Sequence, residues 1–572
     1  MFPVKRAIRP SLRHHARRLP RPAVASQAQK LRLRRLHHPH RVLLTPPHYA
    51  RSRTAQRSVI DPISFLVAVA LSTGIAYVVT AYTSSHETTS TKDDKLEAEQ
   101  DWSAPSAQEY GNNLVMAANM PPGRPGNLTA DQTEKLKEMW AATLDVFGVA
   151  NEPGAANGAA TPSSETASLA DPKQKKKKRL SLFKKKDKDA GSDASSTDND
   201  KHGQNRDFQQ ALASQTPEEL RAAFWSMSKH DHPDALLLRF LRARKWDVHA
   251  ALIMMISTMH WRSAEMHVDD DIMLHGEALA FADSKSPSSN AAQKKEGEDF
   301  LAQLRLGKSF LHGTDKDGRP CCYVRVRLHK QGEQSEKALE RFTVYQIETT
   351  RMLLRPPIDT ATIVFDMTDF SMANMDYTPV KFMIKCFEAN YPESLGSVLV
   401  YKSPWLFQGI WKIIKGWLDP VVASKVHFAS NVEDLQQWIP KSRIMRELGG
   451  DEEYTYTYVE PRGESENEAM QDTATRDRML AERRELVRSY EAETLAWVHG
   501  EEGGEGRTRL AQRLAENYWR VDPYVRARSL YDRMGMLGAG GRLDFYPPKA
   551  GHGAAAGGVG VAASAGHDDG VD

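Results

Sequence analysis

The residues of this 572-residue chain that could do chemistry do not form a catalytic or metal-binding pattern. The segment DKDGRP (Asp315–Pro320) resembles the start of a calcium loop, but its glycine comes too early and no glutamate follows at the required distance. A β-turn is the better interpretation. The cysteines form no CxxC pair, and there is no glycine-rich phosphate loop. We therefore expect no enzyme activity, no metal site and no cofactor.

A polybasic segment, KQKKKKRLSLFKKKDK (Lys173–Lys188), is a second candidate for chemistry. Two lysine blocks flank three apolar side chains, and Ser181 lies between those apolar residues. Each basic residue gains about 1 kcal/mol near an anionic membrane, and phosphorylation of Ser181 would add about two negative charges and weaken that binding. The segment is therefore a candidate phosphorylation switch. A solvated charge run and a nuclear-import-like signal are the alternatives.

The segment from Glu388 to His427 is the most informative part of the chain. After a polar turn and an apolar strand at Ser397–Tyr401, large apolar residues recur at i, i+3, i+4 and i+7. This spacing predicts an amphipathic helix with an aromatic face. Its apolar residues are Trp405, Leu406, Phe407, Ile410, Trp411, Ile413, Ile414, Trp417 and Leu418. A core helix and a membrane-facing helix both fit this periodicity.

These segments have to be positioned by alternating helices and strands. Thr216–Val268 is predicted to be helical, because it opens with an N-cap threonine and a proline at the first helical position. From about Phe310, near-continuous apolar strands alternate with helices. The strands are expected at Cys322–Leu328, Thr360–Phe370, Ser397–Tyr401 and Lys425–Ser430. This alternation is typical of an α/β fold with a mostly parallel sheet.

Four motifs, in the expected order, resemble the CRAL-TRIO lipid-binding family, whose best-known members are the yeast secretory phosphatidylinositol-transfer proteins. They are DALLLRFLRARKWDVHAALIMM (Asp234–Met255), HGTDKDGRP (His312–Pro320), ANYPESLG (Ala389–Gly396) and LDPVVASKV (Leu418–Val426). The resemblance implies a helical N-terminal subdomain, followed by a mostly parallel sheet whose flanking helices enclose a lipid cavity. It also implies that the aromatic helix Trp405–Leu418 is a mobile gate over that cavity.

The resemblance assigns the phosphatidylinositol headgroup to Arg244, Lys245, Glu393 and Lys425. Cationic side chains would neutralise the phosphodiester, and the carboxylate would accept hydrogen bonds from inositol hydroxyls. Ser371 would be a further polar group of the pocket. For Arg244 and Lys245 a solvated helix face is the alternative.

Several positions depart from the family pattern. A threonine that holds the inositol group in the family corresponds to Val422. The positions that serve phosphatidylcholine correspond to Leu311, Cys322, Ile347, Ser394 and Ala373. A quaternary ammonium depends on aromatic faces worth about 0.5–2 kcal/mol each, and the aromatic residues are absent. We therefore expect the second lipid to differ from phosphatidylcholine, with a more apolar lipid as one option.

Composition divides the chain into segments. They are a basic leader (1–60), a transmembrane helix (61–83), a linker (84–119), a helical N-terminal subdomain (120–148 and 207–270), a disordered polybasic insertion (149–206), a lipid-binding domain (298–460), C-terminal helices (461–537) and a disordered tail (538–572). The leader has no acidic residue, which is typical of a mitochondrial transit segment. Ile63–Tyr82 carries no charge, and about 20 residues at ~1.5 Å each span a bilayer core of ~30 Å.

This organisation predicts a membrane-anchored, mitochondrial protein. Its lipid-binding domain would face the intermembrane space, or the cytosol if the anchor lies in the outer membrane. If residues 1–82 come instead from a wrongly assigned start codon, the protein would be cytoplasmic and peripheral to membranes.

The predicted function is therefore the exchange of single lipids between phospholipid membranes, with phosphatidylinositol and a second lipid as ligands and without nucleic acid. Two alternatives remain open. One is a lipid-dependent sensor or scaffold that regulates a protein partner through the C-terminal helices. The other is a carrier of an apolar, sterol- or isoprenoid-like lipid.

Overall fold

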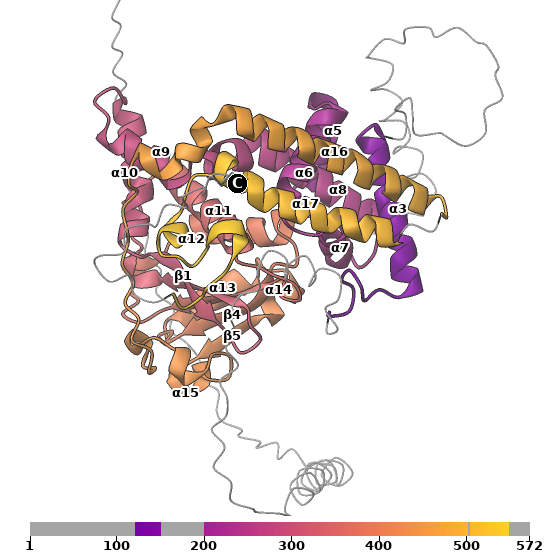
Figure 1. Ribbon diagram of the computed structural model, residues 1–572. Coiled ribbons are helices and arrows are strands. Elements are labelled where there is room, and N and C mark those ends of the chain that lie inside the picture. Colours follow the sequence, from indigo (N-terminus) through magenta and orange to yellow (C-terminus); the bar gives the residue numbers. More distant parts are fainter. Residues whose placement is uncertain (1–119, 150–199, 502–503, 548–572) are drawn as a thin grey trace, which may run out of the picture. The chain divides into compact units, whose positions relative to one another are not determined.

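The computed structural model describes residues 120–149, 200–501 and 504–547 (Figure 1). The predicted leader, transmembrane helix and linker lie outside this part of the chain, as does Ser181. Among the described residues, no helix combines the length and apolar character needed to cross a membrane.

Helices from both sides of the gap at 150–199 build the N-terminal subdomain. They are α3 (Ala130–Val146), α5 (Gln204–Ser214), α6 (Pro217–Ser228), α7 (Pro233–Ala243) and α8 (Val248–His260). Thr129 and Thr216 start α3 and α6 with capping boxes, as their sequences predict. The buried indole of Trp140 donates a hydrogen bond to Asp234 Oδ1 at 2.7 Å, which joins α3 to α7.

The central sheet has the strand order β1-β2-β3-β4-β5. Its strands are β1 (Ser309–Thr314), β2 (Pro320–Arg325), β3 (Ala361–Asp366), β4 (Leu395–Tyr401) and β5 (Val426–Ala429). Strand β1 runs antiparallel to β2, and all other pairs are parallel, so the prediction of a mostly parallel sheet is confirmed. The DKDGRP segment forms the β1–β2 turn, in which Asp315 Oδ1 accepts hydrogen bonds from the amides of Asp317 and Arg319.

The two faces of the sheet have different environments, because successive side chains of a strand point to opposite sides. Tyr323, Val364 and Leu399 pack against α15 (Val432–Leu435) and the loop that follows it. The alternate positions, such as Ile363 and Val398, line a cavity on the other face. The helices that contribute to the wall of this cavity are α10 (Ala291–Arg305), α11 (Glu336–Met352), α12 (Tyr377–Lys385), α13 (Phe407–Lys415) and α14 (Pro420–Ser424).

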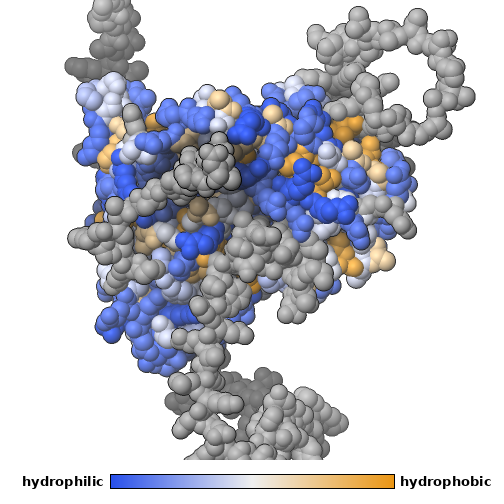
Figure 2. Space-filling view, in the orientation of Figure 1, coloured by the Kyte–Doolittle hydropathy of each residue, from blue (hydrophilic) through white to orange (hydrophobic). Residues whose placement is uncertain are grey.

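The C-terminal helices are part of the same compact body. Helices α16 (Thr473–Val498) and α17 (Gly504–Val525) pack side by side, and α16 also contacts α3 (Figure 1). Helix α16 buries Leu486, Val487 and Tyr490. Figure 2 shows a mainly hydrophilic surface with small apolar patches on the side that carries these helices.

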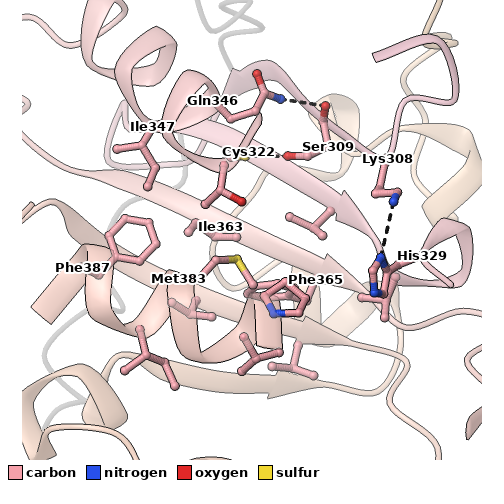
Figure 3. Close-up of a pocket in the computed structure, with 18 of the residues that line it drawn as sticks. Lys308, Ser309, Cys322, His329, Gln346, Ile347, Ile363, Phe365, Met383 and Phe387 are labelled. Carbon is pink, nitrogen blue, oxygen red and sulfur yellow. Dashed lines mark hydrogen bonds between the residues drawn. The ribbon is translucent and has the colours of Figure 1, made fainter. Parts of the chain in front are cut away.

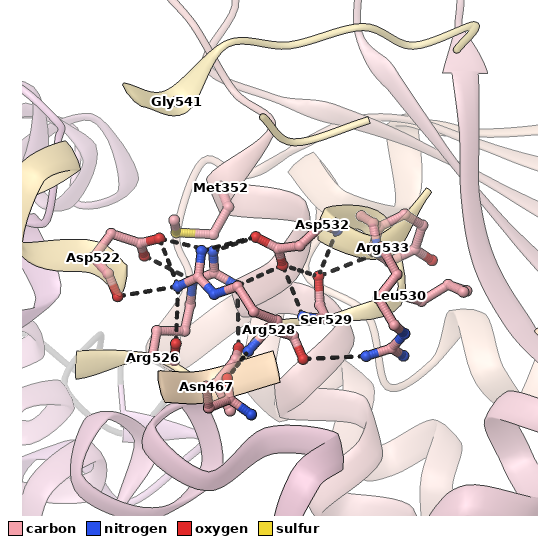
Figure 4. Close-up of polar contacts among 12 residues, drawn as sticks. Met352, Asn467, Asp522, Arg526, Arg528, Ser529, Leu530, Asp532, Arg533 and Gly541 are labelled. Carbon is pink, nitrogen blue, oxygen red and sulfur yellow. Dashed lines mark hydrogen bonds and ion pairs between the residues drawn. The ribbon is translucent and has the colours of Figure 1, made fainter. Parts of the chain in front are cut away.

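A network of arginine–aspartate ion pairs fixes the chain after α17 (Figure 4). Arg526 donates hydrogen bonds to both Asp522 (2.7 and 2.8 Å) and Asp532 (2.8 and 2.9 Å), and Arg528 contacts the same two carboxylates. The short helix α18 (Leu530–Arg533) follows. The hydroxyl of Tyr531 then accepts a hydrogen bond from the amide of Leu311 at 2.8 Å, so this segment covers part of the edge strand β1.

Two predicted boundaries differ from the structure. Helix α5 begins at Gln204, inside the segment 149–206 that was expected to be disordered, because its apolar face packs against α8. The structure also describes residues 538–547, in which the Tyr546 hydroxyl accepts a hydrogen bond from the Thr314 amide at 3.0 Å. The predicted disordered tail (538–572) therefore begins too early. Helix α9 (Leu274–Lys285) and the first part of α10 lie in a stretch that we had assigned to no domain.

Candidate functional site

The main cavity encloses about 300 Å³ between the sheet and helices α11, α12 and α13. Its wall is dominated by aliphatic and aromatic side chains, several of which project inward in Figure 3. The apolar lining includes Ile347, Ile363, Phe365, Met383, Phe387, Val398, Val400, Phe407, Trp411 and Ile414. These apolar side chains form no hydrogen bonds, so this part of the wall is suited to the hydrocarbon chains of a lipid.

Helix α13, which we call the gate helix, closes one side of the cavity. Pro404 precedes it and Gly416 ends it, so it is shorter than the predicted segment Trp405–Leu418. Phe407, Trp411, Ile414 and Leu418 line the cavity, and Ile410 is buried beside them. The core-helix interpretation is therefore correct for this face, whereas the membrane-facing interpretation of the exposed apolar side chains stays a prediction.

The outer surface of the gate region carries exposed apolar residues. Trp405 is 86% exposed, Ile413 on the gate helix is 48% exposed, and Val421 on α14 is 49% exposed. Trp417 packs edge-on against Tyr377, and Leu406 is half-buried, so these two predicted gate residues support the helix from its ends. Lys412 and Lys415 are exposed, as their positions on the polar side of the helix predict.

Glu393 and Lys425 lie together at the amino ends of β4 and β5. Lys425 Nζ is 4.0 Å from Glu393 Oε2, and both side chains remain about a quarter exposed (22% and 25%). Their neighbours Ser394 and Val426 line the cavity, which places the pair at its rim. Glu393 has a φ of 55°, a left-handed conformation that costs a non-glycine residue on the order of 1 kcal/mol. Its carbonyl accepts a hydrogen bond from Arg239 of α7 at 2.7 Å, which helps to hold that conformation.

Arg244 and Lys245 follow the end of α7. The Arg244 guanidinium donates to the side chain of Gln204, and Gln204 Nε2 donates to the carbonyl of Ala389 at 3.3 Å. Burial lowers the pKa of Arg244, although the nearby carboxylates of Asp419 and Glu388 oppose that effect. Arg244 is thus connected, through Gln204, to Ala389 in the motif Ala389–Gly396 that contains Glu393. Lys245 is exposed and has a φ of 52°, and no contact within the described part of the chain joins it to Glu393 or Lys425.

Ser371 does not line the cavity, which corrects its prediction as a pocket residue. It is exposed, and its hydroxyl donates to Asn374 Oδ1 at 2.9 Å, where it caps a short 3-10 turn. Of the positions expected to have lost choline recognition, Cys322, Ile347 and Ser394 line the cavity, whereas Leu311 packs in an adjacent core cluster. Burial raises the pKa of the Cys322 thiol to about 11, so it is neutral and unreactive near neutral pH.

A cluster of polar contacts around Glu388, which the sequence did not suggest, fixes the chain just after the gate helix. Glu388 accepts hydrogen bonds from Lys201 (2.7 Å), His202 (2.8 Å) and the amide of Asp419 (2.6 Å). Lys201 also donates to the carbonyl of Trp417. Burial of Glu388 opposes its ionisation, but the hydrogen bonds from His202 and Lys201 hold its pKa below the ordinary range. Residues near the end of the predicted insertion (149–206) therefore contact the segment that follows the gate helix.

Lys308, His329 and Asp376 also line the cavity and were missed by sequence reasoning. The residues are scattered over the chain, before β1, after β2 and before α12, so no local motif indicates that they meet. Strand β1, which Lys308 directly precedes, is itself absent from the strands predicted from the sequence.

Comparison with known proteins places the chain in a family. The CRAL/TRIO domain matches residues 304–450, and the CRAL/TRIO N-terminal domain matches residues 204–257. The chain belongs to the CRAL-TRIO family of lipid-binding and lipid-transfer proteins, which confirms the resemblance seen in its motifs.

Several of the similar proteins are fungal. CRAL-TRIO domain-containing protein C3H8.02 of Schizosaccharomyces pombe is 45% identical over 430 residues, which cover 73% of this chain and 92% of that protein. Phosphatidylinositol transfer protein CSR1 of Eremothecium gossypii is 37% identical over 454 residues, covering 74% of this chain and all of that protein. Sec14 cytosolic factor of Schizosaccharomyces pombe is 28% identical over 238 residues, or 38% of this chain and 74% of the factor.

Proposed function

We propose that this protein binds phosphatidylinositol and transfers single lipid molecules between membranes through its gated cavity. The observation that carries the proposal is the Glu393–Lys425 pair at the rim of an apolar cavity that the gate helix covers. A carboxylate and an ammonium at this spacing provide an acceptor for inositol hydroxyls and a donor for the phosphodiester. The apolar cavity behind them would hold acyl chains.

The relatives support the same proposal. A protein that is 37% identical over its whole length is named a phosphatidylinositol transfer protein, and this chain carries an ionic pair in its rim motifs. The gate region adds a mechanism, because its exposed Trp405 can enter a bilayer while the opposite face of the helix closes the cavity. Docking would thus place the cavity entrance at the membrane surface.

Transfer of radiolabelled phosphatidylinositol from donor to acceptor liposomes tests the proposal. We expect Glu393→Lys and Lys425→Ala each to slow transfer at least about tenfold, the loss expected when a hydrogen bond to a charged group is removed. The unfolding temperature should hardly change, because a partly exposed pair at 4.0 Å contributes about 0–1 kcal/mol to stability. Glu453→Lys and Lys441→Ala, both on the surface, are the matched controls.

Absence of phosphatidylinositol transfer by the wild-type protein would overturn the proposal, as would full activity of both rim variants. The predominantly apolar lining also favours a second candidate, a carrier of a sterol- or isoprenoid-like lipid without a charged headgroup. Transfer of a radiolabelled sterol that is the same in wild type, Glu393→Lys and Lys425→Ala would support that second function.

A further inference from the structure

The cavity has a second polar end, built by Lys308, His329 and Asp376. Figure 3 shows Lys308 and His329 together at one end of the row of apolar side chains. Lys308 Nζ donates to Gln334 Oε1 at 2.6 Å and lies 3.4 Å from His329 Nδ1. His329 Nε2 in turn lies 3.3 Å from Asp376 Oδ2. The simplest assignment has Nε2–H donating to the aspartate and Nδ1 accepting from the lysine.

This end is remote from the Glu393–Lys425 rim. The carbonyl of Lys308 accepts from the amide of Arg325 at the carboxyl end of β2, and Arg325 pairs with Asp366 at the carboxyl end of β3. The carbonyl of Ser394 instead accepts from the amide of Ala361, at the start of β3. The five steps from Ala361 to Asp366, at about 3.3 Å each, separate the two ends by about 17 Å. The cavity therefore runs along the strands between two polar ends.

Lys308 is a buried cation with little to neutralise it. It is only 5% exposed, and within the described chain no carboxylate oxygen lies within 4.0 Å of its ammonium. Burial lowers its pKa to about 8, partly opposed by the more distant carboxylates of Glu333 and Asp299, so it remains largely protonated at neutral pH. A buried, unpaired charge is costly, and an anionic ligand group beside it would offset the cost.

The surroundings limit which anion can bind there. A smaller hollow of about 170 Å³ adjoins this end and shares Leu339, Thr343, Asp376 and Pro379 with the main cavity. Glu336 and Glu340 also line this hollow, and burial together with Glu336 raises the pKa of Glu340. Acidic walls disfavour a multiply charged phosphate headgroup and are compatible with one small carboxylate held directly at Lys308. The apolar cavity of about 300 Å³ that adjoins Lys308 would hold the hydrocarbon chain of such a carboxylate.

We propose that the Lys308 end is a second recognition site, which binds the carboxylate of a long-chain fatty acid whose hydrocarbon chain lies along the sheet toward the Glu393–Lys425 rim. Lys308 Nζ would donate to the carboxylate, while Gln334 and His329 orient the ammonium. The inference rests on the proposed function in one respect only, namely that this cavity holds the hydrocarbon chains of a lipid. The fatty acid and phosphatidylinositol would be recognised at opposite ends.

Binding of radiolabelled oleate, methyl oleate and oleoyl lysophosphatidic acid to the full-length protein tests this site. In the wild type, oleate should bind at least about tenfold more tightly than its uncharged methyl ester. Lys308→Met, which keeps the length but removes the charge, should make the two affinities equal. Lys330→Met, at an exposed lysine paired with Glu333 at 3.3 Å, should leave the preference unchanged. Equal binding of acid and ester by the wild type would overturn the proposal, and so would tighter binding of the lysophosphatidic acid than of oleate.

Assays of phosphatidylinositol transfer distinguish the fatty-acid site at Lys308 from the proposed transfer function. Lys308→Met should transfer phosphatidylinositol at the wild-type rate, whereas Lys425→Ala should lose transfer and keep the preference for oleate over its ester. If the wild type transfers no phosphatidylinositol but shows the Lys308-dependent preference, only the proposed transfer function fails. If Lys308→Met does not fold, the wild-type preference should still weaken progressively as the pH rises above about 8, where Lys308 of the unliganded protein loses its proton. A preference that stays constant well above this pH would exclude Lys308 as its source.

Discussion

Replacement of Trp405 by alanine should weaken membrane docking without affecting the fold. The side chain is 86% exposed and lies just before the gate helix. Surface substitutions of this kind normally change stability by less than about 0.5 kcal/mol. The structural argument for docking therefore makes a prediction that is separate from folding.

The size of the effect follows from the exposed area. A tryptophan buries about 150–250 Å² when it is covered, so 86% exposure leaves roughly 170 Å² available to a membrane. At about 25 cal/mol per Å², full insertion would contribute roughly 4 kcal/mol, and insertion of half that area about 2 kcal/mol. About 2 kcal/mol corresponds to a roughly 30-fold loss of vesicle affinity in the alanine variant.

Sedimentation with liposomes containing anionic lipid would measure this affinity, and phosphatidylinositol transfer would be recorded in parallel. Leu306→Ala is a suitable control, because Leu306 is 45% exposed at the end of α10, away from the gate helix. A loss smaller than about threefold for Trp405→Ala would refute the docking argument, since it corresponds to under ~0.7 kcal/mol. An equal loss for Leu306→Ala would show that any exposed apolar residue has the same effect.

Further predictions concern stability, pH and bound lipid. Glu348 is fully buried against Arg262 at 2.5 Å, so Glu348→Ala should reduce the free energy of unfolding in urea by about 3–5 kcal/mol, whereas the exposed Glu138→Ala should change it little. The pKa of Glu388 is lower in the folded protein than in the unfolded chain, so its stabilisation is present above its ordinary pKa and is lost as the pH falls below that value. Glu388→Gln should therefore reduce the loss of stability between neutral and acidic pH in thermal unfolding, and an unchanged profile would exclude this contribution. Native mass spectrometry of the purified protein should detect phosphatidylinositol but little phosphatidylcholine, and abundant phosphatidylcholine would contradict the expected loss of choline recognition.

The fold was largely predictable because its signals are local and repeated. Apolar strands between helices predicted the parallel sheet, and the N-cap threonine Thr216 predicted the start of α6. The boundaries were less predictable where tertiary contacts decide them. Helix α5 has an ordinary polar sequence, and its contact with α8 and the hydrogen bonds of Gln204 are not visible in its composition.

The site was predictable only where a motif contains the chemistry. The rim motifs located Glu393 and Lys425, and the structure places them 4.0 Å apart. Ser371 was misplaced because motif register cannot tell whether a loop side chain faces the cavity or caps a turn. The aromatic periodicity could not separate core from membrane face, since the gate helix has both buried and exposed apolar residues. Lys308 escaped notice because its importance arises from burial, which depends on residues far along the chain.

The two polar ends have a consequence for lipid exchange. Because they are joined by one apolar cavity of about 300 Å³, a chain held from the Lys308 end and the acyl chains held from the Glu393–Lys425 rim would need the same space. Binding at one end would then exclude the other ligand by occupation of the hydrocarbon path, without any conformational signal between the headgroup sites. Exchange at a membrane would follow from competition alone, and the gate helix would set only its rate.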